Sequence, residues 1–361
     1  MVRVTVPATS ANMGSGYDSI GIALELYNVI DLEESDRIDI SDKNGQFVPK
    51  DARNLIYQCA KRVYDECGKP LSGLKIVEDC AIPQTRGLGS SSACTVAGIL
   101  GANALLGDPL DRQAVIDLAA TIEGHPDNST PAILGGFCVA LLENGHVHQV
   151  RVPMHSAIDF IVFIPDFKLS TEKARAALPK TIAHRDAVYN LARAALLAGS
   201  LTTGQLENLD VATGDCLHQP YRFGLIENGE DVVRGAKELG ALGAYISGAG
   251  PSIVAMVYKG DRDYLSRAQA MCAEKYPHWK AVQLRCDEVG ATVKCIKIET
   301  ALAVGDIRRK RNRYESYCAK VRRHFGCRHR APEECRGHRD QDGAGRQPGS
   351  GRRIRAGRHD G

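Results

Sequence analysis

The sequence predicts an α+β protein with two domains, and three observations support this fold class. The chain has 361 residues, enough for two hydrophobic cores of ordinary size. It is 43% hydrophobic and 25% charged, as soluble globular proteins usually are. Segments with strand periodicity and segments with helical periodicity occur on both sides of residue 155, which predicts an α+β unit on each side of that boundary.

The predicted N-terminal domain, residues 1–155, opens with two strands and a glycine-containing turn. Val2–Pro7 alternates like a strand, Ile22–Ile30 is a second strand, and the turn Ser10–Asp18 joins them. Asn144-Gly145 is a strong hairpin signal. The other predicted elements are a helix at Asn54–Glu66, a strand at Leu74–Glu78, a helix from Ala93 that Gly107 stops, a helix that Asp111 begins and Glu123-Gly124 ends, and hairpin strands at Phe137–Glu143 and His146–Val152.

The predicted C-terminal domain, residues 156–299, is again a mixture of strands and helices. Ile158–Ile164 is an apolar run with the length of a buried strand. Two strands, Gly243–Ser247 and Ser252–Tyr258, enclose the segment Gly248-Ala-Gly-Pro251. The other expected elements are helices at Thr171–Leu178, Ala187–Ala198, Asp231–Leu239 and Tyr264–Tyr276, and strands at Val282–Arg285 and Thr292–Ile298.

The composition excludes several classes of protein. No apolar run is long enough to span a bilayer, and the N-terminus lacks the charged and then apolar pattern of a signal peptide. The 12 cysteines include no C-x-x-C pair, which argues against a zinc site or a disulfide framework and favours small core residues in a reducing compartment. We therefore expect a cytoplasmic protein without a membrane partner.

Residues 300–361 differ in character from the rest of the chain. From residue 306 onward there are 17 Lys and Arg against 7 Asp and Glu, without a sustained apolar period. Such a segment cannot bury enough surface to offset its ordering entropy, which predicts a disordered basic tail. Translation in an altered reading frame of a GC-rich gene would give the same composition. A basic arm that binds nucleic acid is the functional alternative, but we expect no nucleic-acid partner.

The segment Pro83–Ala93 is the strongest candidate binding element. Gly87 and Gly89 let a ligand approach the backbone, and Ser90–Ser92 follow where the first turn of a helix leaves N–H groups unpaired. The N-terminus of such a helix is suited to binding phosphate. The loop lacks the lysine of the common P-loop and the spacing of a dinucleotide fingerprint, so a capped helix after a tight turn is the structural alternative.

Three glycine-containing segments stand in a fixed order: the turn with Asn12 and Asp18, the Pro83–Ala93 loop, and Ser247–Ser252. This order resembles the GHMP family of small-molecule kinases over roughly residues 3 to 293. Four local motifs resemble the homoserine kinase branch of that family: Pro7-Ala-Thr-Ser-Ala-Asn12, Glu123-Gly-His-Pro-Asp-Asn128, Ser170-Thr-Glu-Lys-Ala-Arg175 and Leu217-His-Gln-Pro-Tyr-Arg222.

The resemblance implies a fold and a reaction. The fold would be the two-domain GHMP kinase fold, with an N-terminal domain like domain 2 of ribosomal protein S5 and a ferredoxin-like α+β C-terminal domain. The reaction would be ATP-dependent phosphorylation of the side-chain hydroxyl of L-homoserine to O-phospho-L-homoserine, a step of threonine biosynthesis. The cofactors would be ATP and Mg²⁺, and we consider a homodimer as the assembly.

By the same resemblance, ATP would be held by the Pro83–Ala93 loop and by Asn54, which matches an adenine-contacting position and is equally suited to be a helix N-cap. Glu123 and Ser91 would hold magnesium. Glu123 ends a predicted helix, where a carboxylate costs about 0.3–1 kcal/mol; cation binding would explain it, and a solvated surface residue is the alternative. The loop residues implied in nucleotide binding are Pro83, Arg86, Gly87, Leu88, Gly89, Ser90, Ser91, Ser92 and Ala93.

The substrate-binding residues are charged or polar side chains of the four motifs. A guanidinium binds a carboxylate with two hydrogen bonds, so Arg175 and Arg222 could hold the α-carboxylate or the transferred phosphoryl group; single arginines also occur as solvated helix residues. Asp18 suits an α-ammonium group and Asn12 a hydroxyl or amide contact, although both are common turn residues. Thr171 lies four residues before Arg175, on the same helix face.

The resemblance further implies that His125 holds substrate and that Asn128 lies near the attacking hydroxyl, with Glu123 and Arg175 as the other catalytic residues. Many homoserine kinases have more residues between the glutamate and the histidine, and capping of the loop is the alternative for His125. The N-terminal turn contains no lysine, unlike that of mevalonate-type relatives. We therefore expect no strong protein base, with the hydroxyl proton passing to the phosphate or to water.

Two other functions compete with this interpretation. The first is a GHMP kinase that acts on a different small alcohol; the arginine pair argues against substrates without a carboxylate, although mevalonate also carries one. The second is a non-catalytic protein that binds nucleic acid through the basic tail.

Overall fold

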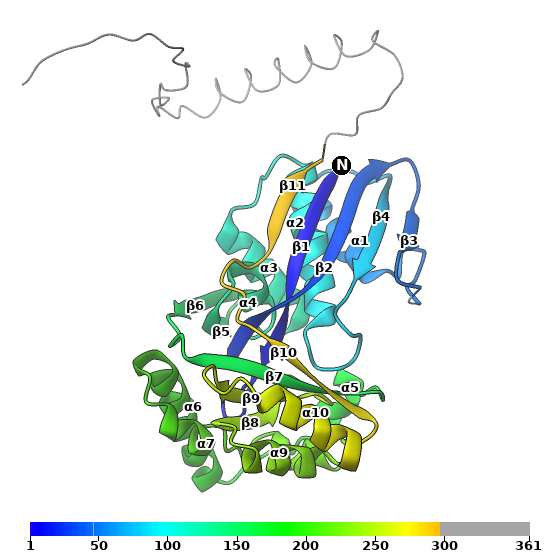
Figure 1. Cartoon of the computed structure of the whole chain (residues 1–361). Helices are drawn as coiled ribbons and strands as arrows, with labels where there is room; N and C mark the ends of the chain where they lie inside the picture. Colours follow the sequence, from blue (N-terminus) through cyan, green and yellow to red (C-terminus); the bar gives the residue numbers. More distant parts are fainter. Residues whose placement is uncertain (46, 297–361) are drawn as a thin grey trace, which may run out of the picture. The chain divides into compact units, whose positions relative to one another are not determined.

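The computed structural model describes residues 1–45 and 47–296, which form two β-sheets and the helices packed against them (Figure 1). The first sheet has the strand order β11-β1-β2-β4-β3, with β5 paired to β2 and β6 paired to β5. Only the β3–β4 pair in it is parallel. Its strands are β1 Val2–Ala11, β2 Ile20–Ser35, β3 Asp39–Asp42, β4 Gly73–Cys80, β5 Phe137–Glu143, β6 His146–Val152 and β11 Thr292–Cys295.

The second sheet has four antiparallel strands in the order β10-β7-β9-β8. Strand β7 is buried along its whole length, as its apolar sequence predicts. Val232 of helix α9 and Ala268 of helix α10 belong to the same buried cluster as Phe163 of β7, so these two helices pack on this sheet. The strands are β7 Ile158–Pro165, β8 Gly243–Ile246, β9 Ile253–Tyr258 and β10 Trp279–Leu284.

The helices begin and end largely at the residues that the capping signals indicate. The Asn54 side chain caps α1, Asp111 caps α3, and Gly124 ends α3 in the left-handed conformation. The helices are α1 Leu55–Glu66, α2 Ser90–Leu105, α3 Arg112–Glu123, α4 Ser129–Leu134, α5 Thr171–Ala176, α6 His184–Thr203, α7 Leu209–Ala212, α8 Gln219–Phe223, α9 Gly229–Glu238 and α10 Tyr264–Lys275, with a 3-10 helix at Leu206–Asn208.

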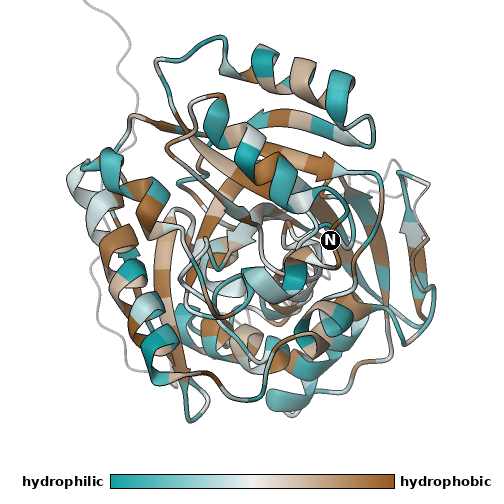
Figure 2. Cartoon of the chain, turned by 90° about the horizontal axis from the view of Figure 1, so that it is seen from below, coloured by the Kyte–Doolittle hydropathy of each residue, from teal (hydrophilic) through white to brown (hydrophobic). Residues whose placement is uncertain are grey.

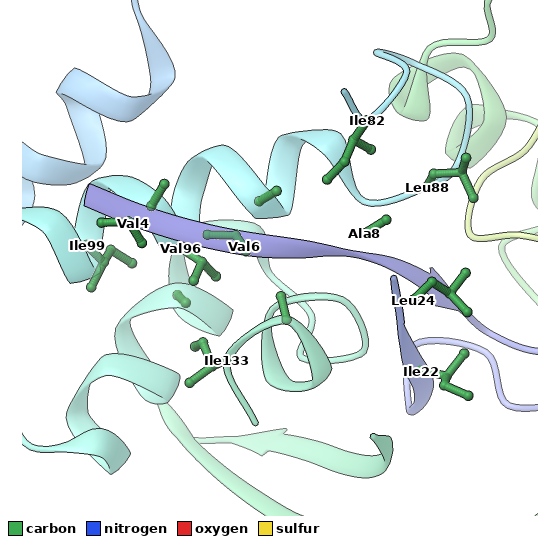
Figure 3. Packing of buried hydrophobic residues seen from close by; sticks show 14 of the residues in the cluster. Val4, Val6, Ala8, Ile22, Leu24, Ile82, Leu88, Val96, Ile99 and Ile133 are labelled. Carbon is green, nitrogen blue, oxygen red and sulfur yellow. The ribbon is translucent and has the colours of Figure 1, made fainter. Parts of the chain in front are cut away.

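Helix α2 is the central helix of the larger core. Val96 and Ile99 of α2 lie against Val4 and Val6 of β1, and all four side chains are fully buried (Figure 3). Burying a side chain of this size stabilises the fold by about 1.5–3 kcal/mol. Figure 2 shows apolar residues concentrated on the strands and polar residues on the outer sides of the helices. The core therefore fixes the position of the N-terminus of α2, where the Pro83–Ala93 loop ends.

Strand β11 corrects one expectation. Thr292–Cys295 does not complete the second sheet; it pairs antiparallel with β1, with Val2 opposite Cys295. The described residues accordingly form one compact unit, in which the chain passes from the first sheet to the second between β6 and β7 and returns to the first with β11. The expected tail of residues 300–361 lies outside the described residues.

Two further properties concern the described part of the chain. None of its helices is both long and apolar enough to cross a membrane. None of the described cysteines forms a disulfide bond, and Cys59, Cys80, Cys138 and Cys272 are buried. The expectation that the cysteines are mostly small core residues therefore fits these four.

Candidate active site

The Pro83–Ala93 loop needs glycine at two positions because its backbone is left-handed and crowded there. Gly87 has φ +73° and Gly89, the N-cap of α2, has φ +69°. A Cβ on Gly87 would overlap the main-chain oxygen of Ser247, and one on Gly89 would overlap the Thr9 hydroxyl. The Ser247 hydroxyl donates to the Gly87 carbonyl over 2.6 Å. The loop is therefore held between the N-terminal strand and the Ser247–Ser252 segment.

The N-terminus of α2 opens into a cavity of about 310 Å³. Four segments far apart in the sequence supply most of its other walls: the turn between β1 and β2, the loop between α3 and α4, and the short helices α5 and α8. The structure thus brings most predicted site residues together. The predicted residues that line this cavity are Asn12, Asp18, Gly87, Gly89, Ser90, Ser91, Ser92, Glu123, His125, Asn128, Thr171, Arg175 and Arg222.

Glu123 ends α3 with its carboxylate turned into the cavity. The residue is partly exposed, but burial of the carboxyl group raises its pKa to about 7, although His125 and the Ser92 hydroxyl favour the ionised form. Ser92 Oγ donates to Oε2 over 3.0 Å, and Oε1 is buried without a hydrogen-bond partner among the described residues. The alternative of a solvated surface glutamate is therefore wrong. The serine that contacts Glu123 is Ser92, while Ser91 lines the same cavity.

The turn between β1 and β2 presents a carboxylate to the cavity. Asn12 shapes this turn: its side-chain oxygen accepts from the Asp18 N–H over 2.9 Å, and its amide donates to the Gly248 carbonyl over 2.8 Å. The Asp18 carboxylate forms two hydrogen bonds of 3.0 Å with the Arg175 guanidinium, which reaches across from α5. Asn12 therefore acts on the turn, whereas the Asp18 carboxylate lines the cavity and is paired there with Arg175.

Arg222 is the largest fully buried side chain of the described residues, with 2% exposure. Its Nη1 donates to the Gly248 carbonyl over 2.9 Å and to His218 Nδ1 over 3.0 Å, and no carboxylate pairs with it within the described ranges. Burial lowers the pKa of this guanidinium. The Tyr17 ring lies 5.5 Å from it and 5.9 Å from the Arg175 guanidinium. Two cationic groups thus face the same cavity, one of them without an acidic partner, as a site for an anion requires.

The loop between α3 and α4 supplies an acid–histidine pair and an amide. His125 Nδ1 lies 2.6 Å from Asp127 Oδ1; this carboxylate and Glu123 raise the pKa of the imidazole against its burial. The Thr9 hydroxyl donates to Asn128 Oδ1 over 2.8 Å, which fixes the orientation of the amide. The NH₂ group of Asn128 makes no hydrogen bond within the described residues, so it can donate into the cavity.

Five predicted nucleotide-binding residues do not line this cavity, and four of them, Pro83, Arg86, Leu88 and Ala93, belong to the loop itself. Leu88 and Ala93 are buried in the core, and the Leu88 carbonyl accepts from the Thr9 N–H. Pro83 and Arg86 line a separate cavity of about 600 Å³, where the Arg86 guanidinium donates to the carbonyls of Gln84 and Asp166. The side chains of these four residues therefore act on the loop and not inside the cavity.

Asn54 lines a neighbouring cavity of about 240 Å³, which shares Leu55, Ser90 and Ser91 with the first one. Its side-chain oxygen accepts from two N–H groups of α1, and its NH₂ donates to the Pro49 carbonyl and to Glu78 Oε1. All the hydrogen-bonding positions of the amide are thus engaged within the protein, which makes Asn54 a helix cap in the wall of this cavity.

Sequence reasoning missed three residues of the site: Thr9, Asp127 and His218. Asp127 lies inside a motif that was recognised, and its signal was a carboxylate two residues after a histidine. His218 lies four residues before Arg222, a spacing that puts both on one helix face. Thr9 also lies inside a recognised motif, Pro7–Asn12, but its role could not be inferred there, because it depends on the contact between β1 and the N-terminus of α4.

Comparison with known proteins identifies the family. The model of the GHMP kinases N terminal domain matches residues 54–136, and that of the GHMP kinases C terminal domain matches residues 192–278. A homoserine kinase of Caldicellulosiruptor bescii is 46% identical over 297 residues, which cover 81% of this chain and 97% of that protein. The chain belongs to the homoserine kinase family of the GHMP kinases.

Other relatives of this GHMP kinase agree. A homoserine kinase of Clostridium beijerinckii is 42% identical over 81% of this chain and 98% of the relative. A homoserine kinase structure from Cytophaga hutchinsonii has a TM-score of 0.73 at 28% identity and covers 81% of this chain and 97% of that one. A mevalonate kinase structure from L. major, with a TM-score of 0.62 at 17% identity over 79% and 96% of the two chains, shares the fold. The predicted two-domain GHMP kinase fold is therefore confirmed.

Proposed function

We propose that this protein transfers the γ-phosphoryl group of ATP to the side-chain hydroxyl of L-homoserine and so makes O-phospho-L-homoserine for threonine biosynthesis. The observation that carries the proposal is the charge pattern of one cavity. It combines a glycine-rich helix N-terminus with a carboxylate from Asp18 and two guanidinium groups from Arg175 and Arg222. A nucleoside triphosphate fits the first feature, and a zwitterionic amino acid fits the second.

The phosphates of ATP would lie at the N-terminus of α2. The N–H groups of the first helical turn and the hydroxyls of Ser90 and Ser91 can donate to phosphate oxygens there. The neighbouring cavity, which shares Ser90 and Ser91 and has apolar walls from Leu55 and Val48, would receive the adenine. Asn54 would support this wall from the first turn of α1.

A magnesium ion fits the donors beside the phosphate site. Mg²⁺ prefers oxygen ligands, and the buried Glu123 Oε1 without a partner lies with the hydroxyls of Ser91 and Ser92 at the same cavity. We therefore assign Glu123 and one of these serines as the protein ligands. The ion would neutralise phosphate charge when bound with ATP.

The amino acid would lie between Asp18 and the two arginines. Its ammonium group would take the place of the Arg175 guanidinium on Asp18, and its carboxylate would accept from Arg222 and from the released Arg175. This exchange pairs both charges of the zwitterion and leaves one guanidinium charge in excess, which the γ-phosphoryl group can balance. Arg175 is also within the cavity that the γ-phosphoryl group would enter, so it can neutralise charge there. His125 and Thr171 would complete the walls around the substrate.

Catalysis would depend on position and charge. The NH₂ group of Asn128, oriented by Thr9, would donate to the oxygen of the attacking hydroxyl. The proton of that hydroxyl would pass to the phosphate or to water. The two carboxylates near this point are already paired, Asp18 with Arg175 and Asp127 with His125. Phosphoryl transfer through a loose transition state requires little assistance from a base.

The direct test is ADP formation by the purified full-length chain with ATP, Mg²⁺ and different alcohols. We expect turnover with L-homoserine and none above background with mevalonate. Turnover with mevalonate and not with L-homoserine would contradict the substrate assignment while keeping the kinase assignment.

Removing one charge from the substrate should be as harmful as removing the other. 4-Hydroxybutanoate lacks the ammonium group and 3-aminopropan-1-ol lacks the carboxylate, so each would break the Asp18–Arg175 pair without replacing both partners. We expect kcat/KM to fall on the order of 10³-fold or more for each compound relative to L-homoserine. A steady-state comparison of the three alcohols checks this, and near-equal values for any two of them would contradict the exchange.

Gly87→Ala should weaken ATP binding much more than a matched change elsewhere. Gly87 and Gly145 both have positive φ, +73° and +79°, so alanine costs each about 1–2 kcal/mol of backbone strain. Only at Gly87 does the new Cβ also overlap main-chain oxygens, while nothing lies within 4 Å of it at Gly145. We expect KM for ATP to rise at least about 10-fold in Gly87→Ala and to stay unchanged in Gly145→Ala. Equal KM values in the two variants would refute the role of the loop.

A further inference from the structure

A chain of hydrogen bonds connects the buried Arg222 guanidinium to the turn that carries Asp18. Arg222 Nη1 lies 3.0 Å from His218 Nδ1, and His218 Nε2 lies 2.8 Å from the Gly14 carbonyl oxygen. The His218 side chain is fully buried, and its ring lies 5.4 Å from the Tyr17 ring. His218 therefore lies between two elements that would bind the substrate, Arg222 and the turn that carries Asp18, although it does not itself take part in the proposed phosphoryl transfer.

The partners of His218 determine its protonation state. A guanidinium can only donate, so Nδ1 must be the unprotonated nitrogen that accepts, and Nε2 must carry the hydrogen that it donates to Gly14. Burial and the Arg222 charge lower the pKa of this imidazole to about 4, although Asp215 and Asp18 act in the opposite direction. The ring is therefore neutral near neutral pH and acts as an acceptor for Arg222.

The charged groups around the ring leave this arrangement intact. Asp215 Oδ2 lies 3.6 Å from His218 Nε2. The same carboxylate accepts from the N–H groups of Leu217, His218 and Gln219 and from the Asn190 side chain, so it is engaged by four donors of its own. Nε2 consequently keeps the shorter contact with Gly14.

The main chain at Gly14 is a fixed point. Gly14 has φ +84°, and a Cβ there would overlap the main-chain oxygen of Thr213. If the His218 imidazole moved, the Gly14 carbonyl could not shift with it without disturbing the packing against Thr213. His218 is thus anchored at Nε2, and Nδ1 presents its lone pair in one direction only.

We propose that His218 is a positioning residue, which orients the Arg222 guanidinium so that its free edge meets the substrate carboxylate. This inference rests on the proposed function. With Nη1 bound to His218 and to the Gly248 carbonyl, and Nε donating to the Ala174 carbonyl over 3.5 Å, the plane of the guanidinium is fixed. Nη2 makes no hydrogen bond to the described residues and is left to bind an anion in the cavity that Arg222 lines. Without His218, the guanidinium would have one anchor fewer and could rotate away.

The test uses the full-length chain with His218→Leu and His218→Asn. Leucine removes both hydrogen bonds, whereas the Asn side-chain oxygen can replace Nδ1 as the acceptor for Arg222. We expect His218→Leu to raise KM for L-homoserine about 10- to 100-fold and to change KM for ATP by less than about 2-fold. His218→Asn should recover most of this loss. Equal changes in the two KM values, or no recovery by asparagine, would overturn the proposal.

Two controls separate positioning from a general loss of stability. Tyr264→Phe removes a different buried hydrogen bond, from the Tyr264 hydroxyl to the Ala236 carbonyl, and should lower Tm without changing KM for L-homoserine. In a double-mutant cycle, His218→Leu should have no further effect on KM in the Arg222→Met background. Additive effects in the cycle would mean that His218 does not act through Arg222.

The outcome is separable from that of the proposed function. If the unmodified protein does not phosphorylate L-homoserine, the substrate assignment fails before any variant is compared. If it does, and His218→Leu leaves KM for L-homoserine unchanged, only the positioning role is refuted. Should His218→Leu fail to fold, as judged by circular dichroism, His218→Phe, which keeps a ring but has no acceptor, replaces it in the comparison with His218→Asn and in the cycle with Arg222→Met.

Discussion

Replacing Glu123 by Gln is expected to abolish phosphoryl transfer and at the same time to make the folded protein more stable above pH 7. The amide keeps an acceptor for the Ser92 hydroxyl but loses the charge that would hold magnesium. We expect kcat/KM to fall on the order of 10³-fold or more. The gain in stability follows from the pKa of about 7. A carboxyl group with a raised pKa in the folded state opposes folding once it is ionised.

The sign and the pH range of this effect follow from linkage. Between the ordinary value of 4.5 and about 7, the folded protein binds this proton and the unfolded chain does not, so the free energy of unfolding falls as pH rises through that range. Above pH 7 the full cost is present, at most about 3 kcal/mol at 1.4 kcal/mol per pKa unit. Glu123→Gln removes it, so the two proteins should differ most at pH 8 and least at pH 4.

Urea unfolding with EDTA present, at pH 4, 6 and 8, measures this difference without a stabilising cation. An initial-rate assay with Mg²⁺ measures the loss of activity. A variant that keeps near-normal turnover would remove Glu123 from the metal site, and one that is less stable than the parent at pH 8 would show that the carboxylate has a stabilising partner. Asp111→Asn, at the other end of α3, is the matched control. It should change neither turnover nor the pH dependence of the free energy of unfolding.

Replacing Arg222 by Met is expected to raise KM for L-homoserine about 10²- to 10³-fold, because a buried charge that pairs with a ligand carboxylate contributes about 2–5 kcal/mol. KM for ATP should change little. Folding should tolerate the substitution, since removing a buried cation without an acidic partner offsets the loss of donors to Gly248 and His218.

Steady-state kinetics with both substrates and a thermal unfolding curve test this expectation. Arg175→Met, at a more exposed guanidinium that already has Asp18 as a partner, is the comparison and should raise KM for L-homoserine less. An unchanged KM in Arg222→Met would place the substrate carboxylate elsewhere. A collapse of Tm would mean that Arg222 stabilises the fold through its three acceptors, His218 and the carbonyls of Gly248 and Ala174.

Local signals in the sequence predicted most of the fold. The Asn54 cap, the Asp111 cap and the Asn144-Gly145 turn each act within a few residues, and the structure confirms all three. The elements that the sequence did not reveal are short or depend on distant contacts. Helix α8 has five residues and cannot form alone; it is held in place by contacts such as the Ile246 N–H donating to Gln219 Oε1.

Strand pairings and side-chain contacts between residues that are far apart in the sequence were the least predictable. Strand β3 has four residues, three of them polar, and forms because it lies beside β4. The partner of β11 could not be inferred, because pairing with β1 spans nearly the whole described chain. In the cavity, the residues that act directly were found from their chemistry, whereas Thr9 and His218 were missed because they act on Asn128 and Arg222 through contacts that only the folded chain provides.

The pairing of β11 with β1 has a consequence for biosynthesis. The Ile296 N–H donates to the Met1 carbonyl over 3.0 Å, so the first and last described residues are neighbours at one corner of the first sheet. On the ribosome, β1 therefore emerges almost 300 residues ahead of the strand that covers its open side. In a chain shortened to end at residue 296, the same proximity would permit circular permutation: a short linker to Met1 would close the backbone, and the hairpin tip at Asn144-Gly145 offers an exposed place to open it.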